Sequence, residues 1–209
     1  MAAPIPTRLI RFATAGLFAL VSVTSLVAAP AGSGAVETRA AAIATAPIGI
    51  DNFGRISDTY YRGSQPAADD YAALAKLGVK TVINLTSDDA LAEEPGMVAK
   101  AGMKYVAIPM NTRVVPTTEQ LAQFLKVVND PASQPVYVHC VGGKHRTGVM
   151  TAVYRMTQNA WTPDKAFNEM KQFKFGADFL HPEFKKFVYG YKAPAPAAAL
   201  PTVLAVQTP

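Results

Sequence analysis

The sequence of 209 residues predicts an α/β fold, a three-layer sandwich in which helices flank a mainly parallel sheet of four to five strands. A pattern in the sequence and a general rule of topology predict this fold. Between residues 48 and 192, short apolar runs typical of strands alternate with segments that carry helical start and stop signals. Strands separated by helices are joined by right-handed crossovers, which cover both faces of a parallel sheet with helices. Ligands of such folds bind at the carboxyl ends of the strands.

The first half of this region predicts three strands and two helices. The strands are residues 60–62, 79–85 and 104–108, and the helices are residues 67–77 and 93–101. The strand at 79–85 is a continuous apolar run of the buried type. Asp69 and Asp70 lie in the first turn of the earlier helix, where acidic side chains interact favourably with the helix dipole. Gly78 and Gly102 supply the two helix ends.

The second half predicts helices on both sides of one short strand. The strand is residues 136–139. One helix precedes it and ends at about residue 129. Three helices follow it: one at 147–158, one that ends at about residue 173, and one that begins at Pro182. Thr117 and Gln120 have the spacing of a capping box before the first of these helices. Thr162 followed by Pro163 places a cap and a helix-starting proline before the third.

Composition excludes a disordered chain and a multi-cysteine site. Hydrophobic residues make up 50% of the sequence, whereas disordered chains lack the apolar residues of a core. The single cysteine, Cys140, cannot form an internal disulfide. The net charge is +5, but residues 32–209 carry 18 basic against 15 acidic side chains with no basic run. No nucleic-acid partner is therefore predicted, and a site for small anions fits better.

The two ends are predicted to lie outside the folded domain at 48–192. Residues 1–31 are predicted to be a signal peptide for export to the periplasm or the exterior, because Arg8 and Arg11 precede an uncharged run of 18 residues that ends in small residues. The alternative is an uncleaved membrane anchor, because this run is at the lower limit for a span. Residues 32–47 are predicted to be a flexible linker, and the Ala/Pro-rich residues 193–209 a disordered tail.

The candidate chemistry is concentrated in residues 139–148, with the sequence HCVGGKHRTG. Between a strand and a helix, this loop can turn its backbone N–H groups inward, and the helix adds the positive end of its dipole. The result is a cradle for a tetrahedral dianion. Cys140 lies at its base, where the same amides favour the thiolate, the nucleophilic form of cysteine. The predicted phosphate-binding residues are Val141, Gly142, Gly143, Lys144, His145 and Arg146.

Four other features of this segment have expected roles. Arg146 has a planar fork that can bind two phosphoryl oxygens. Thr147 can donate its hydroxyl to the thiolate, and His139 can orient the cysteine through its ring nitrogens. Gly142 and Gly143 allow positive φ angles and a close approach of the backbone to a ligand.

A metal site is the competing interpretation of these residues. His139, Cys140 and His145 lack the spacing of metal ligands, so no metal is predicted. Lys144 and His145 either contact a polyanionic substrate at the mouth of the cradle or are solvated loop residues, and both interpretations stay open. Arg62 is favoured as a structural residue.

The segment HCVGGKHRTG resembles the H-C-x-x-G-x-x-R-[ST]-G signature of the cysteine-dependent protein tyrosine phosphatases. The runs YYRGSQP (60–66) and VKTVINL (79–85) and the strand before Pro109 occur in the order expected of the compact dual-specificity branch. The loop is similar to that of the plant- and fungal-type atypical dual-specificity phosphatases, some of which act on inositol phosphates. The resemblance covers about residues 48–190. It implies that Cys140 is the nucleophile, that Arg146 clamps the phosphate and that no metal or other cofactor is needed.

One loop departs from this family's pattern. The family usually takes its general acid, an aspartate, from the loop after the strand equivalent to 104–108, whereas residues 109–116 contain no carboxylate. Asn111, in that loop, cannot protonate a leaving group. Asp88 and Asp89, after the preceding strand, are the candidate acids. A general acid contributes roughly 10²–10⁴-fold, so its loss would slow poor leaving groups without abolishing catalysis.

The sequence thus predicts a phosphomonoester hydrolase that works through a phosphocysteine intermediate. The expected substrate is a phosphorylated protein or, alternatively, an inositol phosphate or phosphoinositide. Two less favoured alternatives are a rhodanese-like sulfurtransferase, which also holds a cysteine in an amide cradle, and a weakly catalytic module that only binds phosphate there. The chain is expected to be a monomer that contacts membranes only if the N-terminal segment is retained as an anchor.

Overall fold

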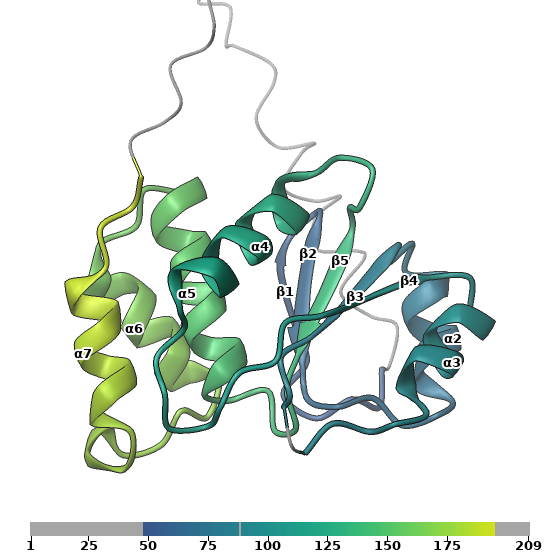
Figure 1. Cartoon of the computed structure of the whole chain (residues 1–209), viewed down its shortest axis with the longest axis horizontal. Helices are drawn as coiled ribbons and strands as arrows, with labels where there is room; N and C mark the ends of the chain where they lie inside the picture. Colours follow the sequence, from purple (N-terminus) through teal and green to yellow (C-terminus); the bar gives the residue numbers. More distant parts are fainter. Residues whose placement is uncertain (1–47, 88, 195–209) are drawn as a thin grey trace, which may run out of the picture. The chain divides into compact units, whose positions relative to one another are not determined.

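Five strands form one sheet in the order β1-β2-β5-β3-β4 in the computed structural model, which describes residues 48–87 and 89–194 (Figure 1). The strands are β1 (Gly54–Ser57), β2 (Tyr60–Gly63), β3 (Thr81–Asn84), β4 (Lys104–Ala107) and β5 (Val136–His139). The last four run parallel, and β1 pairs antiparallel with β2. The sequence does not predict β1, because its four residues contain a single aliphatic side chain, Ile56.

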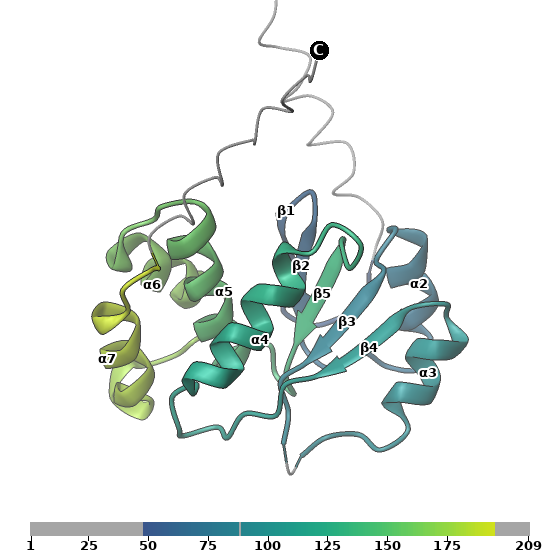
Figure 2. The same ribbon diagram turned by 45° about the horizontal axis from the view of Figure 1, so that its top comes forward.

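Helices cover both faces of the sheet, which confirms the predicted three-layer sandwich (Figure 2). α2 (Asp70–Lys76) and α3 (Glu94–Lys100) cover one face, and α4 (Thr118–Asn129) and α5 (Arg146–Gln158) cover the other. α6 (Pro163–Gln172) and α7 (Pro182–Gly190), with the short 3₁₀ helix η1 (Asp178–Leu180) between them, form a third apolar cluster with α5. The Thr117–Gln120 capping box begins α4, as predicted.

Alternation of side chains along β5 divides the core into two clusters. Val136 and Val138 pack with residues of α4 and α5, whereas Tyr137 packs with residues of α2 and α3. Successive strand residues point to opposite faces. Cys140 belongs to the cluster of Val138, and the ring of His139 stacks on Tyr137 on the other face. The nucleophile candidate and the histidine before it therefore lie on opposite sides of the sheet.

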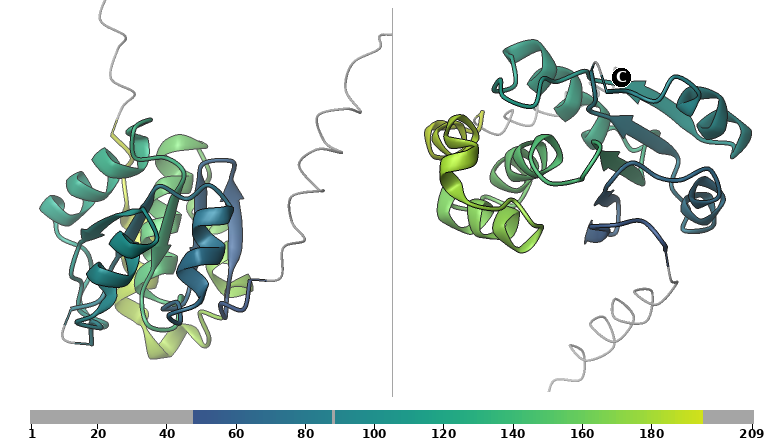
Figure 3. Two further views of the ribbon diagram at one scale, coloured as in Figure 1. Left: turned by 90° about the vertical axis from the view of Figure 1, so that its right-hand side faces the viewer. Right: turned by 90° about the horizontal axis from the view of Figure 1, so that it is seen from below.

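The carboxyl ends of the parallel strands meet at one edge of the sheet, which Figure 3 (right) views from below. The register aligns Gly63, His139, Asn84 and Ala107 across β2, β5, β3 and β4. The loops that follow these four residues consequently share one edge, where parallel-sheet proteins bind ligands.

The predictions for the two ends fall largely outside the described residues. The predicted signal peptide at 1–31 and linker at 32–47 lie there, as does the predicted tail from residue 195 onward. Within residues 48–87 and 89–194, no helix is both long and apolar enough to cross a membrane.

Candidate active site

The segment that carries the candidate chemistry, residues 140–145, joins β5 to α5 and is called here the Cys140 loop. Cys140 is a free thiol with only 3% of its surface exposed. The described residues contain no cluster of three histidine, cysteine, aspartate or glutamate side chains with the arrangement of a metal site. The reactive group available at this edge is the thiol itself.

The carbonyl groups of the Cys140 loop accept hydrogen bonds from outside the loop. The backbone N–H of Gln65 donates to Val141 O at 3.0 Å, and Asn52 Nδ2 donates to Gly143 O at 2.8 Å. The fully buried Arg62 donates to the same Gly143 oxygen through Nη2. None of the loop's own amide N–H groups donates to another residue in the described part of the chain. These N–H groups remain available to an anion inside the loop.

Position 143 of this loop can be occupied only by glycine. Its φ is +61°, and a Cβ atom there would lie 2.4 Å from the backbone carbonyl of Gly63. The expected positive φ is absent at Gly142, where a Cβ would meet only the flexible side chain of Lys144. The close approach of β2 to the loop therefore requires one of the two glycines.

Arg146 begins α5 and points its guanidinium group at the loop that follows β3. Nη1 donates to Asp89 Oδ1 at 2.9 Å and to Met110 O at 3.2 Å, and Nη2 donates to Asp89 Oδ2 at 2.7 Å. Burial by itself lowers the pKa of Arg146, but the bonds to Asp89 and the nearby Cys140 outweigh it and raise that pKa. A guanidinium has five N–H groups, so Nε–H and the second Nη2–H are left on one shared edge. That edge has the spacing to bind two phosphoryl oxygens.

Asp89 lies beside Arg146 at this site, and this pairing disfavours a role as general acid. The hydrogen bonds from Arg146 lower the pKa of the Asp89 carboxyl. A carboxylate paired in this way has no proton to donate near neutral pH. Asp89 instead holds the guanidinium of Arg146. Asp88, the other candidate acid, lies outside the described residues.

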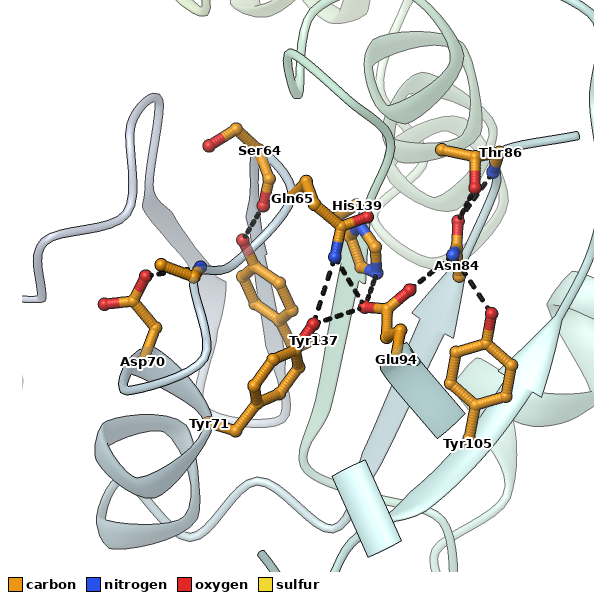
Figure 4. Close-up of polar contacts among 11 residues, drawn as sticks. Ser64, Gln65, Asp70, Tyr71, Asn84, Thr86, Glu94, Tyr105, Tyr137 and His139 are labelled. Carbon is orange, nitrogen blue, oxygen red and sulfur yellow. Dashed lines mark hydrogen bonds and ion pairs between the residues drawn. The ribbon is translucent and has the colours of Figure 1, made fainter. Parts of the chain in front are cut away.

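His139 does not orient Cys140 by direct contact, because its ring lies on the α2–α3 face of the sheet. Nε2 lies 2.9 Å from Glu94 Oε1, and both side chains are fully buried (Figure 4). The contact is short but bent relative to an ideal N–H···O hydrogen bond. Glu94, which the sequence analysis does not single out, is the partner of this histidine.

Glu94 lies at the centre of a buried polar network (Figure 4). Tyr71 Oη donates to Oε1 at 2.8 Å, Gln65 Nε2 donates to Oε1 at 2.9 Å, and Asn84 Nδ2 donates to Oε2 at 2.5 Å. Burial by itself raises the pKa of Glu94, but His139 and these donors outweigh it and lower that pKa. Glu94 is therefore a buried carboxylate. One feature of the sequence could have drawn attention to this residue: two glutamates, at 93 and 94, precede a proline at the start of a helix.

The structure also gives the surroundings of Thr147, His145 and Lys144. Thr147 Oγ1 is buried and makes no hydrogen bond to Cys140 or to any other described residue. The ring of His145 is held by Phe175 O, at 3.1 Å from Nε2, and lies 3.8 Å from the ring of His181. Burial and His181 lower the pKa of His145. The half-buried Lys144 makes no hydrogen bond within the described residues and is the side chain free to meet a substrate.

Comparison with protein families and curated proteins points to one group. Residues 52–183 match the family described as "DSP-PTPase phosphatase fused to NAD+ Kinase". The chain is 32% identical over 125 residues to the dual specificity protein phosphatase TpbA of Pseudomonas aeruginosa, and 29% identical over 130 residues to the inositol diphosphatase SIW14 of Saccharomyces cerevisiae. Each alignment covers 60% of this chain. The chain spans 56% and 46%, respectively, of the lengths of these two relatives.

A solved structure agrees with these relatives. The crystal structure of P. aeruginosa TpbA in complex with phosphotyrosine aligns with a TM-score of 0.59 and 28% identity. The alignment covers 70% of this chain and 87% of that one. The fold and the sequence comparisons therefore indicate the same family.

Proposed function

This chain belongs to the family of dual-specificity-type protein tyrosine phosphatase domains, and on that premise we propose that it hydrolyses phosphomonoesters through a phosphocysteine intermediate on Cys140. One observation carries this proposal. The buried thiol lies in a loop whose carbonyls are bonded from outside, next to an arginine with one free donor edge. This arrangement matches a tetrahedral dianion held over a nucleophile.

The proposed reaction has two displacement steps at phosphorus. The Cys140 thiolate forms an S–P bond while the bond from phosphorus to the leaving oxygen breaks, and the leaving group takes up a proton. Water then forms a P–O bond while the S–P bond breaks, which releases inorganic phosphate, passes the water's proton to solvent and restores the thiolate. The N–H groups of the Cys140 loop and the free edge of Arg146 stabilise the equatorial oxygens in both steps.

The proton for the leaving group does not come from a carboxylic acid among the described residues of this site. Asp89 is held as a carboxylate by Arg146, and residues 109–116 contain no carboxylate. Hydrolysis is therefore proposed to favour substrates whose leaving oxygen carries charge easily, such as aryl phosphates. The phenolate oxygen of tyrosine, which leaves when phosphotyrosine is hydrolysed, is a leaving group of this type.

The proposed substrate is a phosphorylated protein, with an inositol phosphate or phosphoinositide as the alternative. The names of the relatives support both, since one is a dual specificity protein phosphatase and another an inositol diphosphatase. A release panel with a phosphotyrosine peptide, a phosphoinositide and an inositol polyphosphate distinguishes these classes. We expect the highest kcat/KM for the phosphotyrosine peptide, because aryl oxygen is the best leaving group of the three.

The mechanism is tested with Cys140→Ser and an aryl phosphate. We expect turnover to fall by at least about 10⁴-fold, because a serine hydroxyl is a far weaker nucleophile than a thiolate, while binding of inorganic phosphate persists. Rapid quench of the wild type should trap one phosphoryl group on Cys140. Residual activity of a few per cent in the serine variant would contradict the mechanism, and sulfur transfer from thiosulfate without phosphate release would indicate a sulfurtransferase.

We also propose that the catalytic domain is exported. The proposal is supported by the positive residues Arg8 and Arg11 and by the uncharged run that follows them. Mass spectrometry of the mature N-terminus after cell fractionation tests it. A new N-terminus near residue 30 in the exported fraction is expected, and intact protein in the cytoplasm would contradict it.

A further inference from the structure

Glu94 is a buried carboxylate that the reaction proposed above does not use. Its side chain is fully buried and accepts contacts from four side chains that belong to four different segments. A carboxylate removed from water is costly unless every oxygen is paired. Glu94 nevertheless lies buried near the edge of the sheet that carries the Cys140 loop, and its contacts lead to that loop.

One oxygen of Glu94 holds both neighbours of the nucleophile. Oε1 lies 2.9 Å from Nε2 of His139, the residue before Cys140. The same oxygen accepts from Gln65 Nε2 at 2.9 Å, and the backbone N–H of Gln65 donates to the carbonyl of Val141, the residue after Cys140. Through this one oxygen, Glu94 contacts the side chain of the residue before Cys140 and the side chain of Gln65, whose backbone bonds to the residue after Cys140.

The other oxygen of Glu94 reaches the loop that presents Asp89. Oε2 accepts from Asn84 Nδ2, and Asn84 Oδ1 in turn accepts from the backbone N–H and the hydroxyl of Thr86, at 2.7 and 2.6 Å. Thr86 starts the segment that leads to Asp89, which holds Arg146. Glu94 therefore contacts His139 and Gln65 beside the nucleophile and, through Asn84, Thr86 before the Asp89 segment; Figure 4 shows these contacts of Glu94 and Asn84.

We propose that Glu94 is a positioning residue for phosphoryl transfer, which holds His139 and, through Gln65, Val141, so that the amides of the Cys140 loop converge on the sulfur and on the phosphoryl oxygens. This proposal rests on the phosphatase function proposed above. Misplacement of a reacting group by about 1 Å costs about 10²-fold in rate. Because positioning acts in the transition state, its loss lowers kcat more than it changes KM.

The test uses Glu94→Gln, with Glu169→Gln as the matched control. Glu169 is a buried carboxylate on α6 whose hydrogen bonds and ion pair, within the described residues, go to Arg155, at 2.6 Å for the ion pair. Both substitutions remove a buried charge, so both are expected to lower stability. At a temperature where both are folded by circular dichroism, Glu94→Gln should lose about 10- to 100-fold in kcat for an aryl phosphate, with KM within about threefold. Glu169→Gln should stay within about twofold of the wild type.

A second readout does not require turnover. Cys140 is the single cysteine, so its alkylation by iodoacetate is followed by intact mass across pH. In Glu94→Gln the midpoint pH of alkylation should rise by about half a unit or more, because loosened amides stabilise the thiolate less. Gln65→Ala removes one link and leaves the carboxylate paired with His139 and Tyr71, so it should show a smaller rise and provides a test if Glu94→Gln does not fold.

A double variant tests whether Glu94 acts through His139. The double variant Glu94→Gln with His139→Gln should match Glu94→Gln alone within about threefold, because the first change already releases the ring. Three results would overturn the inference. The first is a double variant whose loss in kcat equals the product of the two single losses, and the second is an alkylation midpoint that falls in Glu94→Gln. The third is an equal loss of kcat in Glu94→Gln and Glu169→Gln. Absence of turnover in the wild type would instead overturn the proposed function, and the alkylation midpoints would then decide the positioning role.

Discussion

Arg146 serves two partners through different edges of one guanidinium group. Asp89 accepts from both Nη1 and Nη2, and the carbonyl of Met110 accepts from Nη1, which fixes the plane of the group. The Nε and Nη2 edge remains for a ligand. A charge-assisted pair on one edge therefore orients the donors on the other, and an ammonium group has no second edge to orient.

Arg146→Lys is predicted to be nearly as damaging as Arg146→Ala. A lysine supplies the positive charge but cannot form two parallel N–H···O bonds to the transferring phosphoryl group. We expect kcat to fall by about 10²–10³-fold in both variants. Steady-state kinetics with an aryl phosphate measures this, and near-wild-type kcat in the lysine variant would show that Arg146 is not the clamp.

Asp89→Asn is predicted to slow aryl and alkyl phosphates by a similar factor. The carboxylate supports Arg146, which acts on the phosphoryl group common to both substrates, and the pair is partly exposed, so a loss of roughly 3- to 10-fold is expected. Selective loss for the alkyl substrate, with a flattened basic limb of the kcat profile, would identify Asp89 as the general acid instead. The pH–rate profile for the two substrates decides between these outcomes.

At the scale of elements, the strand β5, the Cys140 loop and helix α5 form the unit on which the site is built. β2 and the residues after it hold the Cys140 loop in place. Arg62 in β2 and the backbone of Gln65 just after it donate hydrogen bonds to carbonyl groups of the loop. The ring of Phe173 lies 4.1 Å from the guanidinium carbon of Arg62 and covers it. These bonds hold the carbonyls of the loop on its outer side, and the amides of the loop make no backbone hydrogen bonds within the described residues.

Gly143→Ala is predicted to disrupt this unit, and Gly142→Ala provides the comparison. An alanine at 143 would need a left-handed conformation and would contact the backbone of Gly63 at 2.4 Å, which no side-chain movement relieves. We expect a loss of phosphate affinity of at least about tenfold and a destabilisation of about 1–3 kcal/mol. Isothermal titration with inorganic phosphate and urea unfolding measure both. An equal loss in the two variants would contradict the role given to Gly143.

At the scale of the whole molecule, parallel crossovers bring distant segments to one edge of the sheet. Asn52, Gln65, Glu94 and Arg146 come from four separate stretches of the chain, yet all of them contact the Cys140 loop or the residues that support it. The same edge concentrates buried charge. The proposed positioning role of Glu94 and its expected contribution to stability therefore rest on the same buried carboxylate.

Stability is predicted to decrease in acid partly through Glu94. The folded-state pKa of Glu94 is lowered below its ordinary value of 4.5, so the carboxylate stabilises the fold above about pH 4.5 and this contribution is lost as pH falls through the folded-state value. Urea unfolding followed by the fluorescence of Trp161 should show Glu94→Gln less stable than wild type at pH 7, by on the order of 3 kcal/mol. The difference should shrink toward pH 3.5. A difference that is constant across this range would contradict the linkage.

The sequence by itself determined the order of elements and the reactive segment. Apolar runs and helix caps are local signals, so the strands from β2 to β5 and the helices from α2 to α7 follow from neighbouring residues alone. The motif at 139–148 depends on spacing within one loop, which is why the nucleophile candidate Cys140 and its loop lie where they were predicted. The hairpin strand β1 carries too little apolar pattern to be predicted in this way.

Only the tertiary structure decided which partners these residues have. The alternation of β5 places His139 and Cys140 on opposite faces, which gives the histidine to Glu94 rather than to the sulfur. Asp89 is a candidate acid from its position in the sequence, and its pairing with Arg146 keeps it ionised. Such contacts join residues separated by 45 and 57 positions, and the crossovers of the sheet set their distance and burial. Because proton affinity depends on those surroundings, residue type and spacing predict the reactive groups, while packing decides their charge.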